Sequence, residues 1–545
     1  MPGDPVHVLL LPLPSWGHVR PLCVLAGHLV AEGNSTITLL MAPNLLEKAR
    51  AEVVRQFPEG HPALQKMRIV SMFNSTETNI FKLIKPFTET YPTLYKRLHQ
   101  GETIECATTG TTFDAVVAPS VAILDFFCLP QLQATRAISG TSTQIIAQWV
   151  TGGAFTIIRL FGPESLGGLG NFGERIDAEA ERTGKDPVEI GDAIFRHTDG
   201  SVINIPGLPP MHDYEFFPQK LPFNAPVAPI LRGGYAFLME CDGVIISTAE
   251  AYEKTSLDAL KSWLTGLSKP LYALGPLVPR TLRSEATTSE TDRFKTFLDE
   301  MQAQHGKHCV IYISFGTVFW PTVNDYVEEL VEALLEMKAP FILCHASPFA
   351  KISDELRSKV VNSGIALLTI WCPQQLILSH SVSLSVPLQS CSLDDRSQAT
   401  GWFLTHGAQW FDVHFVCGAD SRSQGGHGGL MESLSSGVPL ICWPFDADQP
   451  AAAKHLTHNL NVAFELVEVR TGLGMKPSYG SDKVPEGTRE AVGREIRAVV
   501  ADCRGETGKE KRKNAERLRA ELLEAWSVGG PAKCAIGDFL GSLHH

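Results

Sequence analysis

The sequence predicts an α/β protein with two parallel, doubly wound domains. An apolar strand at 6–12 is followed by a loop, by apolar residues at helical spacing over 22–32, and by a strand at 37–41. A buried strand running into a glycine turn recurs at 309–317, repeating the design of residues 6–18. The length of 545 residues suffices for two domains of ordinary size. Ligands of such sheets bind at the carboxyl ends of the strands.

The composition describes a globular protein, with 44% hydrophobic and 19% charged residues. A net charge of −12 and a pI near 5.9 argue against a nucleic-acid partner. The 12 cysteines are scattered singly, without CxxC pairs or metal-binding spacing, as in proteins with reduced thiols. Residues 6–13 are too short and too broken by proline for a signal peptide, and no run could span a membrane. We therefore expect a cytoplasmic protein without an integral membrane segment.

The first domain carries a histidine at its functional edge. The string LPSWGHVRP at 13–21 places His18 in a loop between the first strand and the first helix. A single loop histidine is usually solvated, so a role for it depends on a wider pattern. Further strands are expected at 113–119 and 242–248, and residues 281–291 read as a polar linker.

The second domain combines strand ends with a glycine turn. Strands are expected at 309–317, 341–344, 365–369 and 403–405, and the last of these runs into His406. The glycines of 426–429 form a turn from which residues 430–436 continue as a helix. The bare N–H groups and positive dipole end of such a helix suit a diphosphate. Residues 510–526 read as a charged amphipathic helix.

An ordered set of motifs lies between residues 371 and 449. It comprises WCPQQLILSH at 371–380, GWFLTHG at 401–407, GHGGLMESLSSGVP at 426–439 and CWPFDADQ at 442–449. Trp371 can stack on a flat base, and Glu432 can accept hydrogen bonds from two ribose hydroxyls. Each residue alone is more often part of a buried strand–helix unit, so the inference rests on the whole set in order.

This set resembles the nucleotide-sugar signature of the UDP-glycosyltransferases, an inverting family whose plant members carry WxPQ…LxH…GxFxTHxGxxxxxE…GxPxxxWPxxxDQ. The resemblance covers most of the chain and is closest to soluble plant and fungal members. It implies the GT-B architecture, in which two Rossmann-like domains face a cleft. The acceptor-binding domain would span 1–268, the linker 269–295 and the UDP-sugar-binding domain 296–525. Residues 526–545 would pack back on the first domain.

The resemblance implies roles for residues of the first domain. His18 matches the histidine of the family's GHxxP motif, the general base that takes a proton from the acceptor hydroxyl. In plant relatives a strand ends in an aspartate that holds this histidine, and here we expect Pro119, which cannot do so, at that place. Asp125 could then reach back from the next helix, or could equally cap that helix. Thr141 would lie near the donor sugar.

The resemblance also implies a donor site. Residues 211–223 resemble the variable acceptor segment, and a small lipophilic alcohol is the expected acceptor. UDP-glucose is the expected donor, a co-substrate rather than a cofactor, because Gln449 resembles the glucose users; no metal is expected. The expected donor-binding residues are Ser314, Gly316 and Thr317 at the phosphates, Trp371 and Gln374 with Glu432 at the nucleoside, His406, Gly428 and Gly429 at the diphosphate, and Asp448 and Gln449 at the sugar.

Two polar inserts interrupt the signature. Removing 382–398 or 408–425 restores the family spacing on either side. The first begins with valine and ends with glutamine, whose codons can supply the GT and AG ends of an intron, so one hypothesis is retained introns or gene-model errors. The other is surface loops, because loops are cheap to lengthen. The second insert lies between His406 and the glycine turn, inside the expected diphosphate site.

Two other function classes remain open. The first is a weak or inactive relative that binds nucleotide or acceptor without turnover, which Pro119 and the inserts motivate. The second is a nicotinamide dehydrogenase, which would need a GxGxxG string after a first strand. Neither domain has that string after its first strand.

Overall fold

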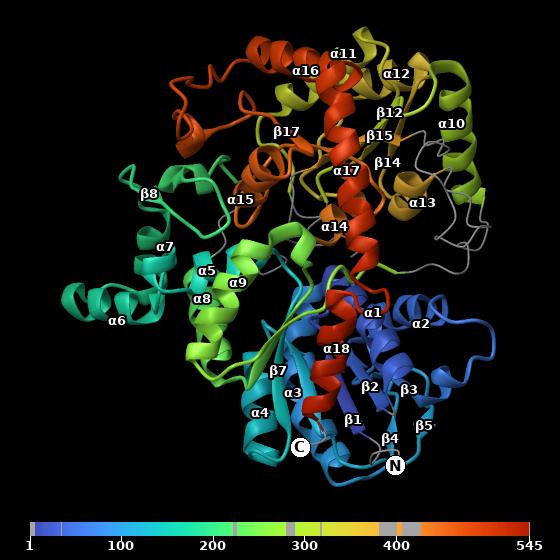
Figure 1. Cartoon of the computed structure of the whole chain (residues 1–545), viewed down its shortest axis with the longest axis vertical. Helices are drawn as coiled ribbons and strands as arrows, with labels where there is room; N and C mark the ends of the chain where they lie inside the picture. Colours follow the sequence, from blue (N-terminus) through green and yellow to red (C-terminus); the bar gives the residue numbers. More distant parts are fainter. Residues whose placement is uncertain are drawn as a thin grey trace.

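The computed structural model describes residues 6–33, 35–221, 226–279, 289–316, 319–380, 400–405 and 427–543. Two α/β domains lie one above the other, each built on a parallel sheet (Figure 1). The first sheet has the strand order β11-β10-β7-β6-β1-β2-β3 and the second the order β14-β13-β12-β15-β16-β17. This confirms the predicted fold class.

The strands of the first sheet are continuous apolar runs, as expected for a sheet with helices on both faces. They are β1 (Val6–Leu11), β2 (Ser35–Met41), β3 (Met67–Ser71), β6 (Val121–Asp125), β7 (Gln144–Trp149), β10 (Gly243–Ile246) and β11 (Leu271–Ala273). The helices are α1 (Trp16–Glu32), α2 (Leu46–Val54), α3 (Ile80–His99), α4 (Leu129–Ser139), α5 (Ala154–Phe161), α6 (Phe172–Thr183), α7 (Pro187–Arg196), α8 (Ala228–Glu240) and α9 (Glu250–Gly266). Two hairpins pair β4 (Ile104–Glu105) with β5 (Thr112–Phe113) and β8 (Val202–Ile203) with β9 (Met211–His212).

The second domain repeats the alternation of strands and helices. Its strands are β12 (Val310–Ser314), β13 (Phe341–Cys344), β14 (Ala366–Thr369), β15 (Thr400–Thr405), β16 (Leu440–Cys442) and β17 (Ala463–Glu465). Its helices are α10 (Ser289–His305), α11 (Asn324–Glu336), α12 (Asp354–Ser363), α13 (Gln374–Ser379), α14 (His427–Ser435), α15 (Gln449–Lys454), α16 (Arg489–Arg504) and α17 (Glu506–Glu524).

The chain returns to the first domain at its end. Helix α18 (Pro531–Ser542) lies beside α1 and the edge strand β11 (Figure 1). The Tyr272 and Phe539 rings meet edge to face with centroids 5.2 Å apart, and Lys533 pairs with Glu32. The predicted packing of the terminal segment on the first domain is therefore present.

The boundaries between the domains differ from those expected. Strand β11 pairs in parallel with β10, so the first sheet continues beyond residue 268 into the stretch expected to be linker. Helix α10 already begins at Ser289, before the end expected for the linker at residue 295. The connection between the domains therefore falls within 274–288.

The strand expected at 113–119 is wrong. Only Thr112 and Phe113 form a short strand, and Val117 is 53% exposed. The buried strand is β6, which comes later and has all of its residues buried. Both stretches are apolar. The one that forms a strand of the sheet is the one whose two faces are both covered by other parts of the domain.

The two sheets point the carboxyl ends of their strands toward one another. Gly152, after β7, lies against Asp448, after β16. Arg20, in the first turns of α1, forms an ion pair with Glu432 of α14. In the part of the chain described here, no helix is long and apolar enough to cross a bilayer.

Candidate active site

His18 lies in the first turn of α1 rather than in a loop. Its side chain is buried, and its Nδ1 lies 2.7 Å from Oδ2 of Asp125. A carboxylate only accepts hydrogen bonds, so Nδ1 carries a proton. Nε2 is then the ring nitrogen that can take a proton from another molecule.

Asp125 is the last residue of β6, not part of the next helix. The Phe127 N–H donates to its Oδ1 over 3.1 Å, which fixes the carboxylate between that amide and the imidazole. The expectation that Pro119 takes the place of the supporting aspartate is therefore wrong. Pro119 lies before β6, where its carbonyl accepts a hydrogen bond from Thr143 at 2.9 Å.

Thr141 lies at the wrong end of the sheet for a sugar contact. It is exposed in the turn that leads from α4 into the amino end of β7, whereas Asp125 is at the carboxyl end of the neighbouring strand. The hydroxyl at the carboxyl end of β7 belongs to Thr151, which is buried and has no hydrogen-bond partner among the described residues. The misplaced strand at 113–119 had shifted the expected position.

Asp448 and Gln449 form a buried polar pair where β16 leads into α15. Gln449 Oε1 accepts from the Phe445 N–H at 2.7 Å, while its Nε2 and both Asp448 carboxyl oxygens have no partner within the described residues. Burial raises the pKa of Asp448 to about 8, and the nearby Asp446 carboxylate adds to this. Buried polar atoms are rarely left unpaired, so this pair is a candidate to bind ligand hydroxyls.

A glycine of the first domain lies against this pair. Gly152 has a φ of +78°, and a Cβ at this position would lie 3.0 Å from Asp448 Oδ2. A side chain at residue 152 would therefore occupy the space in front of the carboxyl group. The buried Glu253 carboxylate, whose pKa burial raises to about 7, holds the adjoining backbone by accepting from Phe155 N at 3.3 Å.

Glu432 lies at the junction of the domains and is held by protein groups. Its Oε2 accepts from Gln374 Nε2 at 2.9 Å, and its Oε1 accepts from Arg20 of α1. Arg20 also pairs with Glu52 at 3.3 Å, and the Tyr312 hydroxyl donates to Gln374 Oε1 at 3.1 Å. The carboxylate expected to bind ribose is thus in a network that also contains a residue close to His18.

The start of α14 is a candidate ligand site. Gly428 is exposed, with no heavy atom of the described residues within 4 Å of a Cβ placed there, and a Cβ placed at Gly429 would lie 3.2 Å from Gln374 Nε2. The preceding residue, His427, is buried against the Tyr252 ring of the first domain, with centroids 6.1 Å apart. Burial lowers the pKa of His427 to about 4, so its imidazole is neutral at this helix end.

The other expected donor residues lie near the same edge of the second sheet. Ser314 ends β12, in register with Thr405 of β15, and Gly316 follows with a φ of +69°. Trp371 follows β14 and is half-buried. Thr317, His406 and both inserts, 382–398 and 408–425, lie outside the described residues.

An apolar cavity of about 320 Å³ lies next to His18. Phe127 joins the two, because it lines the cavity and its ring meets the His18 ring edge on, with centroids 5.7 Å apart. The other apolar residues in the wall are Leu13, Pro14, Ile80, Phe81, Ile84, Phe87, Leu129, Pro130, Pro226, Pro229 and Ile230.

The segment expected to vary with the acceptor does not line this cavity. The part of 211–223 that the structure describes packs on the second domain instead. The Tyr214 hydroxyl donates to the Pro477 carbonyl and Gln219 Nε2 to the Val469 carbonyl, each over 2.8 Å. This segment therefore joins the domains.

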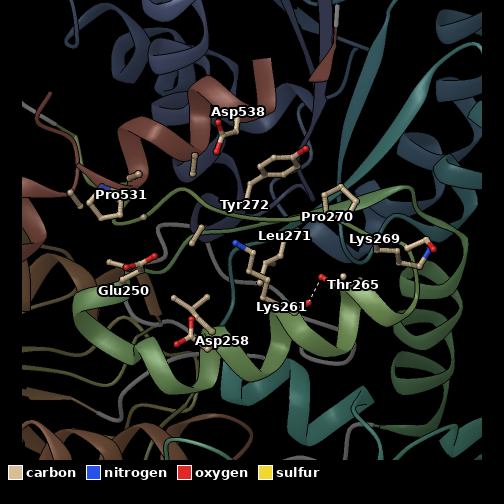
Figure 2. Close-up of a pocket in the computed structure, with 18 residues that line it drawn as sticks. Glu250, Asp258, Lys261, Thr265, Lys269, Pro270, Leu271, Tyr272, Pro531 and Asp538 are labelled. Carbon is tan, nitrogen blue, oxygen red and sulfur yellow. Dashed lines mark hydrogen bonds between the residues drawn. The ribbon is translucent and has the colours of Figure 1, made fainter. Parts of the chain in front are cut away.

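A second cavity, of about 480 Å³, is separate from the site. Figure 2 shows Lys261 and Thr265 of α9 on one side of it, Asp538 of α18 on the other, and Tyr272 between them. None of the residues expected to bind donor or acceptor lines it. Across the described ranges, no group of three or more His, Cys, Asp or Glu side chains could hold a metal ion.

Comparisons with known proteins agree with this arrangement. The family model described as UDP-glucoronosyl and UDP-glucosyl transferase matches residues 422–471. The chain is 30% identical over 556 residues to the UDP-glycosyltransferase eriJ of Hericium erinaceus, and the match covers 98% of each chain. The chain belongs to the UDP-glycosyltransferase family. UDP glycosyltransferase 9 of Catharanthus roseus is 23% identical, over 99% of this chain and 97% of its own.

Solved structures show the same fold for this UDP-glycosyltransferase. A UGT transferase from Siraitia grosvenorii, in complex with UDP, superposes with a TM-score of 0.64 at 17% identity and covers 99% of this chain and 100% of its own. Phytolacca americana UGT2, complexed with UDP-2-fluoro-glucose and pterostilbene, superposes with a TM-score of 0.62 at 17% identity, with the same coverage. The architecture is GT-B, and the family transfers sugar from a UDP-sugar donor.

Sequence reasoning missed several residues of the candidate site in this glycosyltransferase. Arg20 and His427 were inside quoted motifs, but their contacts to the opposite domain depend on how the domains face each other. A strand prediction for QIIAQW at 144–149 would have placed Thr151 just after the carboxyl end of that strand. Phe127 and Gln131 line the cavity next to His18 from the loop and helix after β6, so predicting them required the correct position of that strand.

Proposed function

We propose that this UDP-glycosyltransferase is an inverting enzyme that moves glucose from UDP-glucose to a hydroxyl of a small lipophilic acceptor, with His18 as the general base. The observation that carries the proposal is the hydrogen bond from His18 Nδ1 to Asp125 beside an apolar cavity. It supports an imidazole that is oriented, has the required tautomer and lies next to a space for the acceptor.

The chemistry follows from that arrangement. Nε2 of His18 takes the proton of the acceptor hydroxyl as its oxygen attacks the anomeric carbon from the side opposite UDP. Asp125 stabilises the imidazolium that forms. A single displacement of this kind inverts the configuration of the sugar. The open N-terminus of α14 at Gly428 and Gly429, with Ser314 and the undescribed His406 and Thr317, would meet the negative charge on the leaving diphosphate.

The proposed sugar site is the unpaired polar cluster at the domain junction. Asp448 and Gln449 offer an acceptor and a donor for sugar hydroxyls, and Thr151 faces the same junction from the first domain. Glucose is proposed because Gln449 resembles the residue found in glucose users. Glu432 and Gln374 would bind the ribose, and Trp371 would stack on the base.

A lipophilic acceptor is proposed because none of the described residues in the wall of the cavity beside His18 is charged. Burying a charge in such a wall would be costly. The Phytolacca americana structure, solved with pterostilbene, supports an acceptor of this general kind. We also propose that transfer needs no metal and occurs in the cytoplasm. Unchanged product formation in the presence of EDTA would support the first of these.

A weak or inactive relative remains the second candidate on the strength of the two inserts. Pro119, the other reason for considering an inactive protein, no longer supports it, because Asp125 is hydrogen-bonded to His18. A UDP-binding titration beside a transfer assay separates the two candidates. Binding without any product would favour the inactive protein.

The deciding experiment is mass spectrometry of products from UDP-glucose and a panel of phenol, sterol and lipid alcohols. A product heavier by one hexose, with the β-configuration by NMR, is the expected result. A retained α-configuration would contradict the single displacement. UDP-xylose and UDP-glucuronic acid in parallel reactions test the choice of sugar.

A further inference from the structure

One buried amide lies in the mostly apolar wall of the proposed acceptor cavity. Gln131, in the first turn of α4, is 3% exposed and lines the cavity together with Thr88 of α3. Its Nε2 donates to Thr88 Oγ1 over 3.3 Å. Its Oε1 accepts no hydrogen bond from any of the described residues.

An unpaired amide at this place has a cost. Leaving a buried hydrogen-bonding group without a partner is unfavourable. Water can satisfy Gln131 while the cavity is empty, but a wholly apolar acceptor would displace that water without replacing its hydrogen bond. An acceptor with a hydroxyl at this position would replace it. A hydroxyl both donates and accepts, so it suits either orientation of the amide oxygen and nitrogen.

The same cavity connects this amide to the proposed base. The part of the cavity wall near His18 contains Leu13, Pro14 and Phe127. Gln131 lies four residues after Phe127 in the sequence. A volume of about 320 Å³ is near the lower end of small-molecule pockets, which span roughly 300–1,000 Å³. An acceptor in this cavity would therefore contact the wall that contains Gln131 and the Phe127 ring that adjoins His18.

We propose that the acceptor is a small uncharged diol, with one hydroxyl at His18 that receives the sugar and a second that binds Gln131. This inference rests on the proposed function, since it presumes that the cavity holds the acceptor. Gln131 acts here as a specificity-determining residue. It contacts the acceptor away from the reacting oxygen.

The test uses matched pairs of aromatic probes of three sizes: hydroquinone with phenol, naphthalene-2,6-diol with 2-naphthol, and 4,4′-biphenol with 4-phenylphenol. Calorimetry with UDP present measures their binding, and mass spectrometry measures transfer from UDP-glucose. For the pair that fits best, we expect the wild-type protein to bind the diol about tenfold more tightly, since one hydrogen bond contributes about 1.4 kcal/mol.

Substitution of the amide should remove this preference. Gln131→Leu keeps the side-chain size, so the affinities of diol and mono-ol should become equal within about twofold, with the mono-ol bound at least as tightly as before. Thr88→Val gives a second, milder variant and should reduce the preference partly. Gln100→Leu, at an exposed position after α3, is the matched control and should keep the wild-type ratio.

The outcomes separate this inference from the proposed function. Wild-type protein that shows no diol preference in any of the three pairs overturns the inference, as does a preference that Gln131→Leu leaves unchanged. A diol preference lost in Gln131→Leu supports the inference even if no product forms, because binding does not depend on turnover. Product formation without the preference would leave the proposed function standing alone.

Discussion

A buried histidine–carboxylate pair links the local sequence to the chemistry. The imidazole is held by the first turn of α1 and the carboxylate by the end of β6. These residues are 107 apart in the sequence and come together because β1, which leads into α1, pairs with β6. Asp125 is itself fixed by a backbone amide. The pair therefore has the geometry that the proposed proton transfer requires.

We predict that His18→Ala abolishes transfer and leaves UDP affinity within a few-fold of wild type. The loss of a general base typically costs ~10²–10⁴-fold in rate, and His18 belongs to the domain that holds the acceptor. Single-turnover product formation and a UDP titration by calorimetry provide the two measurements. Near-normal turnover in the variant would reduce His18 to a structural residue of α1.

Ribose hydroxyls would compete with protein side chains for the Glu432 carboxylate. This carboxylate pairs with Arg20 and Gln374, so ribose hydroxyls must share or replace those partners. We predict that Glu432→Ala raises the KM for UDP-glucose by ~10–100-fold with little change in kcat. Hydrogen bonds to a charged group contribute about 1.5–3 kcal/mol, and these exist in both ground and transition states.

Arg20→Met is the matched variant for that prediction. It removes the guanidinium from Glu432 and keeps much of the side-chain volume, so we expect the KM for UDP-glucose to fall. Steady-state kinetics at constant ionic strength compares the two variants. A large fall in kcat at unchanged KM for Glu432→Ala would argue against a ribose role.

At the scale of elements, the sequence was informative where a strand or helix had a clear apolar period. Strands β1, β2, β12, β13 and β15 and helix α14 lie where the patterns placed them within a few residues, whereas helix α1 begins at Trp16 rather than at residue 22. The glycine turn expected at 426–429 is wrong in part, because α14 begins at His427 and Gly428 and Gly429 belong to its first turn. These elements carry most of the expected donor site.

The errors came from a choice between two apolar stretches. Residues 113–119 and 121–125 have similar character, and only the sheet decides which of them has both faces covered. That misplacement put Pro119 at the position that Asp125 occupies. A local pattern could not correct it, because burial on two faces depends on helices distant in sequence.

The strand–turn–helix unit of the second domain carries a prediction about the second insert. The described chain ends at Thr405 of β15, in register with Ser314 and Cys442, and begins again at His427 of α14. We predict that deleting 408–425 raises transfer activity and lowers the dissociation constant for UDP, and that the full chain is weak or inactive. Fixed geometry matters here, because a misplacement of about 1 Å can cost ~10²-fold.

The first insert supplies the control for this deletion. Removing 382–398 changes the chain between His380 and Thr400, at the amino end of β15, so its effect on UDP affinity should be small. Calorimetry and product analysis compare the full chain with both deletions. A full chain that binds and turns over as well as the 408–425 deletion would identify that insert as a tolerated loop.

At the scale of the whole molecule, the two domains meet through both the site and the returning C-terminal end. The site contributes Gly152 against Asp448 and the ion pair of Arg20 with Glu432. The fold class was predicted from the sequence, and the packing of the C-terminal segment on the first domain was predicted from the resemblance. The contacts between side chains of the two domains could not be predicted. No pattern within one domain determines how that domain is oriented relative to the other.

The returning end carries the last prediction, which concerns Trp526. Its ring stacks on His28 of α1 with centroids 3.6 Å apart, and its Nε1 donates to the Pro276 carbonyl at 3.0 Å. The side chain thus ties the start of the terminal segment to the first domain and to the connection between domains. We predict that Trp526→Ala destabilises the protein by about 3–5 kcal/mol, as usual for a large buried aromatic residue. Thermal unfolding followed by circular dichroism measures the change.

Val528 gives a matched position two residues further along, since its side chain is 98% exposed. Val528→Ala should change the free energy of unfolding by no more than ~0.5 kcal/mol. The contrast separates loss of the Trp526 contacts from any general sensitivity of this segment. If both variants unfold at the wild-type temperature, the terminal segment is only loosely attached. The cavity between α9 and α18 would then not be a stable feature of the molecule, because α18 forms one of its walls.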